Sequence, residues 1–328
     1  MKNKAKLSTD IILKEFWRNN DRFADLFNTV LFDGMQVLEA NELEEMDTDV
    51  SGTVDVKGFN QSISRIRDVI KKTAYGMDFI ICGVENQCKV HYAMPLRNMI
   101  YDALGYLKEF NEIKQTFKNN NSKGRENKAE EFLSGMTKND RFHPIITIVI
   151  YYGEKEWDGP YSLADMMFDL PANVKNIFSN YKMNLLQVRS SDKYNFSNKD
   201  VETVFEISRN IFNENYDDIS NSYKDKDINA ELGMIIGKIT DSNFIIEQSS
   251  HGRELVNMCT ALEKLKNQGV EEGLREGLRE GLKEAKIKTA RKSLEQGLEV
   301  ELISKITDLS IDEIQKIKQL MISEGDNL

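Results

Sequence analysis

The spacing of apolar residues predicts a helix near the start of the chain, beginning at Asp21 with Asn20 or Asp21 as its N-cap. Apolar residues three and four apart share one face of this helix: Phe23, Leu26, Phe27, Val30 and Leu31. Asp21 and Asp25 lie on the opposite face. This position of Asp25 fits plain solvation.

A β-rich stretch comes next. Three strands are expected, over Gly52–Phe59, Ser64–Thr73 and Met77–Gln87. A helix opens at Met94–Pro95, since proline is favoured in a first helical turn, and runs to about Ile113.

Residues 144–152 are continuously apolar and β-branched, which predicts a strand buried on both faces. Tyr181–Val188 is a further short strand candidate, and from Lys199 onward the pattern is helical. All four prolines lie in the first 171 residues. This composition shift predicts a mixed α/β front and a mostly helical rear.

A four-residue repeat marks the rear half. Glycine recurs at Gly269, Gly273, Gly277 and Gly281, and leucine follows at Leu274, Leu278 and Leu282. Each interior glycine costs about 1 kcal/mol relative to alanine. This helix is therefore either a solvated connector or a surface for self-association. The tail beyond it carries a capping box at Ser310 and Glu313 and forms either a packing hairpin or a helix-turn-helix.

Composition excludes several classes of protein. The 328 residues are 40% hydrophobic, which is typical of a globular chain, and no apolar run approaches the length of a bilayer span. The N-terminus lacks an apolar signal region, and three cysteines favour a reducing cytoplasm. Cys82, Cys88 and His91 lack the second ligand pair of a zinc finger. A net charge of −10 excludes DNA binding by bulk attraction, so any nucleic-acid contact needs a local basic patch or a cation.

One predicted hairpin carries candidate chemistry. Glu85 and Gln87 alternate onto one face of the strand Met77–Gln87. With Gly76 and Met77 at the turn centre, Asp68 falls opposite Glu85, and such cross-strand Cβ atoms are about 5 Å apart. Two carboxylates this close repel unless a cation separates them, and Mg²⁺ binds one or two carboxylates while keeping water and substrate phosphate. The alternative is two solvated acids at the ends of a hairpin.

The sequence also resembles a known family. The runs NDRFADLFNTVLFDG, RDVIKK, GVENQCKVHYAMPLRNMIYDALGY and HPIITIVIYYGEKEWDGPYSLADM, with the EGLREGLKE repeat, are similar to the Rpn (YhgA-like) recombination-promoting nucleases and putative transposases. Members of that family belong to the PD-(D/E)xK nuclease superfamily. The resemblance implies a restriction-endonuclease-like fold, in which helices flank a mixed sheet, followed by a mostly helical C-terminal region.

The resemblance also implies roles for individual residues. Asp68, Glu85 and Gln87 are expected to be catalytic, and Asp68 and Glu85 to hold Mg²⁺ or another divalent cation. Gln87 occupies the place of the superfamily's lysine. Asp25 is a further candidate acid. Arg97 opens the following helix, where a guanidinium and helix amides bind phosphate, or it is a surface arginine.

Five basic residues fall in the polar segment 114–128, expected as a loop or a frayed helix end, and are candidates for DNA binding: Lys114, Lys118, Lys123, Arg125 and Lys128. The expected regions are a nuclease-like, transposase-like domain at 1–215, a helical region at 216–268, the repeat helix at 269–290 and a small helical tail at 291–328. The leading interpretation is a cytoplasmic, metal-dependent DNA endonuclease in recombination or mobile elements, with homo-oligomerisation through the C-terminal helices and no membrane contact. An inactive nuclease fold that binds partners through its tail, and a nuclease for RNA, stay open.

Overall fold

A computed structural model describes residues 8–46, 49–56, 59–66, 68–75, 78–121, 129–169, 171–224, 226–250 and 254–325. The chain divides into two compact units, Met1–Cys259 and Thr260–Leu328. Each unit has its own apolar core. Among the described helices, none has both the length and the apolar character needed to cross a bilayer.

The first unit is an α/β domain. Its helices are α1 (Thr9–Arg18), α2 (Asn20–Leu31), α3 (Met94–Asn121), α4 (Ala129–Ser134), α5 (Ala172–Lys175), α6 (Lys199–Phe212), α7 (Tyr216–Tyr223), α8 (Ala230–Ile239) and α9 (Asn243–Ser250). Its strands are β1 (Glu44–Glu45), β2 (Asp49–Val56), β3 (Phe59–Ile66), β4 (Val69–Tyr75), β5 (Asp78–Gln87), β6 (Ile145–Tyr151), β7 (Asn184–Gln187), β8 (Asp227–Asn229) and β9 (Leu255–Asn257).

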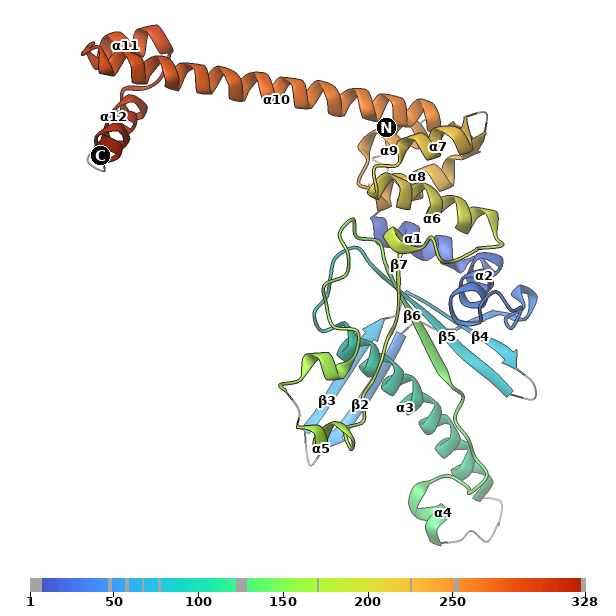
Figure 1. Ribbon diagram of the computed structural model, residues 1–328. Coiled ribbons are helices and arrows are strands. Elements are labelled where there is room, and N and C mark those ends of the chain that lie inside the picture. The colour runs from blue at the N-terminus through green and yellow to red at the C-terminus, as the bar shows by residue number, and fades with distance from the viewer. Residues whose placement is uncertain are drawn as a thin grey trace, which may run out of the picture. The chain divides into compact units, whose positions relative to one another are not determined.

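Five strands form the central sheet in the order β1-β4-β5-β6-β7. The pairs β1/β4 and β4/β5 are antiparallel, whereas β5/β6 and β6/β7 are parallel, so the sheet is mixed as expected. Strand β6 is the predicted doubly buried strand, and Ile148, Val149 and Ile150 have no exposed surface. Strands β2 and β3 form a separate two-stranded ribbon that lies against α3 (Figure 1).

Helices cover both faces of this sheet. In Figure 1, α3 lies below the strands, and α1, α2 and α6 lie above them. Ile70 of β4 packs under Leu104 of α3 on one face. Helix α3 comes very close to β6, because a Cβ on Gly105 would lie 2.5 Å from the Ile145 side chain. On the other face, the Nζ of Lys71 binds the Asn20 side chain at the start of α2.

The structure corrects three expectations for the first unit. Helix α1 was not predicted. Helix α2 begins at Asn20, and its N-cap is Asn19 rather than Asn20 or Asp21. The Asn19 side chain accepts the capping bond from the Arg22 amide. The predicted strand Ser64–Thr73 is in fact the end of β3 and the start of β4, which pair with different partners. Asp68 thus precedes β4 rather than lying inside it. Helix α3 continues to Asn121, well beyond Ile113.

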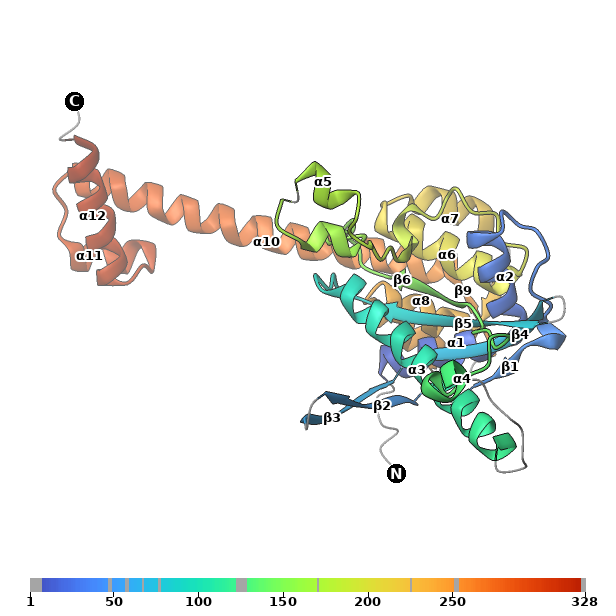
Figure 2. The same ribbon diagram turned by 90° about the horizontal axis from the view of Figure 1, so that it is seen from below.

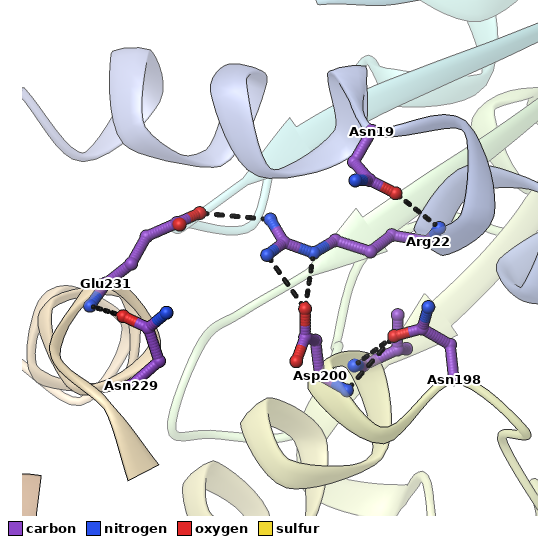
Figure 3. A network of polar contacts seen from close by, with 7 residues as sticks. Asn19, Arg22, Asn198, Asp200, Asn229 and Glu231 are labelled. Atoms are coloured by element: carbon purple, nitrogen blue, oxygen red, sulfur yellow. Dashed lines mark hydrogen bonds and ion pairs between the residues drawn. The ribbon is translucent and has the colours of Figure 1, made fainter. Parts of the chain in front are cut away.

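An arginine links three helix N-termini above the sheet. The Arg22 guanidinium donates to Asp200 at 2.8 and 3.0 Å and to Glu231 at 3.0 Å (Figure 3). Each of the three helices begins at an asparagine cap: Asn19 for α2, Asn198 for α6 and Asn229 for α8. Acidic side chains in the first turn of a helix also interact favourably with the helix dipole. The network therefore fixes α2 relative to α6 and α8.

The second unit is entirely helical where it is described. It comprises most of α10 (Met258–Glu295), then α11 (Val300–Thr307) and α12 (Ile311–Gly325), seen at the end of the long helix in Figure 2. Asp308 adopts a left-handed conformation that ends α11, and Ser310 and Glu313 form the predicted capping box. A small core joins the three helices through Ala290, Ile303, Leu309, Ile314 and Ile317.

Lys71 makes the first unit's stability depend on pH in a predictable way. Its side chain is 1% exposed, and burial lowers its pKa to about 8. The native state therefore binds fewer protons than the unfolded state between about pH 8 and 10.5, and stability rises with pH across that window. Lys71→Met removes this dependence. Urea denaturation at pH 7 and pH 10 measures the free energy of unfolding. It should rise with pH in the parent and change less in the variant. An equal change in both proteins would mean that Lys71 does not carry a buried charge.

Candidate active site

The two candidate acids lie on neighbouring strand ends, where β4 begins and β5 ends. Strand pairing runs from Tyr75↔Asp78 to Val69↔Val84, which is the register predicted from the sequence, although the turn residues Gly76 and Met77 lie outside the described residues. Asp68 directly precedes Val69, and Glu85 directly follows Val84. Extending the register by one residue therefore places Asp68 opposite Glu85.

Both oxygens of Asp68 have partners. Oδ2 accepts a 2.7 Å hydrogen bond from the backbone amide of Asn86, the residue after Glu85. Oδ1 lies 3.1 Å from the Nζ of Lys14, a residue of α1. The side chain is 11% exposed. Burial raises the pKa of Asp68 above its ordinary value, and the Asn86 amide and Lys14 only partly offset that rise.

Glu85 is the most deeply buried acid of the site, with 1% of its side chain exposed. The Arg97 guanidinium of α3 lies 3.6 Å from Glu85 Oε2, and its Nε donates to the Tyr101 hydroxyl at 2.8 Å. Burial would lower the pKa of Arg97, but the Tyr101 bond and the charges of Glu85 and Asp68 raise it above its ordinary value. Both carboxylates therefore contribute to the raised pKa of Arg97.

Gln87 lies on the same face of β5 as Glu85, because side chains two residues apart point the same way. It pairs with Tyr151 of β6, as Glu85 pairs with Val149. Its backbone carbonyl accepts a 2.8 Å bond from the Tyr152 amide. Asn86 points to the other face, where its Oδ1 accepts from the Tyr152 hydroxyl, which in turn accepts from the Trp17 indole. These bonds fix the end of β5 between β6 and α1.

The donors at this site suit a hard divalent cation. Carboxylate oxygens are the ligands that Mg²⁺ prefers, and it takes one or two of them while keeping water and phosphate. Asp68 and Glu85 are two such carboxylates on adjacent strand ends. Within the described residues, no group of three or more His, Cys, Asp and Glu side chains is arranged to hold a metal ion.

The remaining candidates lie elsewhere. Asp25 Oδ1 accepts a 2.9 Å bond from the Ser197 amide just before α6, so its described contact ties α2 to α6. Lys114 and Lys118 belong to the last turns of α3 rather than to a loop, and the Lys114 Nζ lies over the Phe110 ring. Lys123, Arg125 and Lys128 lie outside the described residues.

Lys14 is the site residue that sequence reasoning missed. It also pairs with Asp10 on its own helix at 3.2 Å. The helix itself had a readable signal, since Leu13, Phe16 and Trp17 are spaced for one buried face and Ser8 caps it. The contact with Asp68, 54 positions away, has no local signal.

The comparisons with known proteins concern the second unit. Residues 283–319 match the family model described as the C-terminal HTH domain of the Rpn/YhgA-like nuclease family. The matched span covers the end of α10, all of α11 and most of α12, and it favours the helix-turn-helix over a plain packing hairpin. No curated protein and no solved structure matched the chain.

Proposed function

We propose that this chain, which belongs to the Rpn/YhgA-like nuclease family, is a metal-dependent DNA endonuclease of the PD-(D/E)xK type that acts in recombination or on mobile elements. The observation that carries the proposal is that Asp68 and Glu85 lie on neighbouring strand ends, with Asp68 bonded to the amide of Asn86, the residue after Glu85. Keeping two acids together at a covered sheet end is costly, and such arrangements concentrate at functional sites.

Each side chain has a role in phosphodiester hydrolysis. Asp68 and Glu85 would hold Mg²⁺, which supplies a Lewis acid and lowers the pKa of bound water. The Gln87 amide orients the attacking water or donates to a phosphate oxygen. Arg97 carries a guanidinium that pairs well with phosphate. The hydrogen bond from its Nε to the Tyr101 hydroxyl orients this guanidinium.

DNA is the proposed partner of both units. In a helix-turn-helix, the second helix enters the major groove, which assigns that role to α12. Its exposed face presents Gln315, Lys316, Lys318 and Gln319, which are side chains able to contact base edges and phosphates. The described cysteines are free thiols, which fits the proposed cytoplasmic location.

One observation favours the alternative of an inactive nuclease fold that serves as an interaction module. Each carboxylate already has a protein cation near it, Lys14 for Asp68 and Arg97 for Glu85. Because these cations compensate the negative charges of the two acids, the site is stable without a metal ion. Metal-dependent cleavage decides between the two functions, and comparing plasmid with single-stranded RNA decides between DNA and RNA as the substrate.

Glu85→Gln tests the enzyme directly. The change keeps the size of the side chain but removes the charge that binds the cation. We expect the rate of plasmid cleavage in Mg²⁺ to fall by at least about 100-fold. Residues that only hydrogen-bond to a metal ligand already change metal affinity or activity by about 10- to 100-fold when they are mutated. EDTA should abolish cleavage by the parent.

Glu44→Gln is the matched control, because Glu44 is an exposed glutamate of the same sheet that pairs with Lys72. It should cut like the parent. Equal cleavage by the parent and by Glu85→Gln would assign the activity to another site or to a contaminant.

The basic segment 114–128 leads to a prediction about the salt dependence of DNA binding. Replacing Lys118, Lys123 and Arg125 by Gln should weaken DNA binding and flatten the dependence of log K on log salt concentration, by about 0.9 for each phosphate that is no longer neutralised. Fluorescence anisotropy between 50 and 200 mM salt, as typical conditions, measures the slope. Replacing Lys193, Lys199 and Lys224 by Gln removes the same charge elsewhere and should leave the slope unchanged. If both triple variants behave alike, the segment makes no specific contact.

Homo-oligomerisation through α10 is part of the proposal. Leu274, Leu278 and Leu282 are 74%, 65% and 56% exposed in the single chain. A Cβ added at Gly269, Gly273, Gly277 or Gly281 would meet nothing within 4 Å. A glycine-rich helix is marginal in water by itself, so a second copy packed along this stripe would stabilise it.

Truncation near Lys266 separates this role from catalysis. The shortened protein should stay folded and keep metal-dependent cleavage of non-specific DNA, but form a smaller assembly. Light scattering on both proteins measures the mass. Identical masses would make the repeat a connector, and a truncated protein that does not fold would make the helical rear part of the core.

A further inference from the structure

Lys14 stands between two carboxylates that differ in burial. Its Nζ lies 3.1 Å from Asp68 Oδ1 and 3.2 Å from Asp10 Oδ2. The Asp68 side chain is 11% exposed, whereas that of Asp10 is 56% exposed. Lys14 therefore has one acceptor inside the site and a second one in solvent, one helical turn back on α1.

The two cations of the site are held differently. Arg97 near Glu85 is anchored by the Tyr101 hydroxyl and lies over the Tyr101 ring. The described partners of Lys14 are the two carboxylates alone, and its ammonium ends a flexible four-carbon stem. Lys14 is thus the cation that can leave its acid in the site and still pair with a second carboxylate.

A divalent cation at Asp68 and an ammonium at Asp68 Oδ1 repel each other, because both are positive and need the same carboxylate. Metal binding must therefore displace Lys14 or tolerate its charge. Asp10 offers the displaced ammonium an acceptor without a change of backbone.

We propose that Lys14 is a positioning residue that competes with the divalent cation for Asp68. In the metal-free protein it orients the Asp68 carboxylate and compensates its charge. When the cation binds, the ammonium leaves Asp68 and stays paired with Asp10. The Lys14–Asp68 ion pair thereby limits the metal affinity of the site. This inference rests on the proposed metal-dependent function.

Calorimetric titration of the full-length protein with Mn²⁺ alone tests it. Lys14→Met keeps the apolar stem but removes the competing charge, so Mn²⁺ should bind about three- to tenfold more tightly. Lys14→Arg should bind Mn²⁺ like the parent. Arg18→Met is the matched control, because Arg18 is a cation of the same helix that pairs with Glu15 and Glu45 and should not affect the metal.

A purely structural role for Lys14 would give the opposite result, since a distorted site binds metal more weakly. Unchanged or weaker Mn²⁺ binding by Lys14→Met overturns the inference. Lys14→Gln provides a second neutral variant if Lys14→Met does not fold. Suppose that the parent binds Mn²⁺, that Glu85→Gln weakens this binding, and that Lys14→Met does not tighten it. The metal site would then stand, and only the proposed role of Lys14 would be wrong. If the parent binds no Mn²⁺, the metal-dependent function fails with it.

Discussion

Carboxylates that are enclosed at the end of a sheet need positive charge close by, and this constraint shapes the site. Antiparallel pairing of β4 with β5 sets Asp68 and Glu85 on neighbouring strand ends. Their compensation comes from the two helices that cover the sheet, Lys14 from α1 and Arg97 from α3. Neither helix is optional for the site, because removing one partner of a buried ion pair leaves an uncompensated charge. The charges thus tie the placement of both helices to the chemistry of the strand ends.

Buried and half-buried charges with polar partners also stabilise the fold above the sheet. Lys71 reaches from β4 to the side chain of Asn20, which opens α2. Arg22 then connects α2 to Asp200 and Glu231, in the first turns of α6 and α8 (Figure 3). These polar contacts fix the angles between helices that apolar packing alone specifies less sharply. The candidate site therefore lies on a sheet whose covering helices are tied together by polar contacts, as preorganised chemistry requires.

Local patterns in the sequence were enough for some features. The register of β4 with β5 followed from placing a two-residue turn at Gly76 and Met77. The doubly buried β6 followed from a run of β-branched residues, and the start of α12 from a capping box. Other features depended on contacts across the chain. Asp68 has strand-like neighbours, yet β3 and β4 join different sheets, so it lies in the bend between them. Helix α3 continues beyond Ile113, and Phe117 in the added turns is buried, a tertiary contact that the local pattern does not reveal. The pairing of Lys14 with Asp68 is a tertiary contact that no spacing rule encodes.

Locating a bound cation in a crystal tests the account most directly. Crystals grown with millimolar Mn²⁺ and measured at a wavelength where manganese scatters anomalously would show the ion as a discrete peak. The account predicts a peak coordinated by oxygens of both Asp68 and Glu85, with the Lys14 ammonium turned to Asp10. A map with no peak at these residues, and with Lys14 and Arg97 still paired to the two acids, would contradict it.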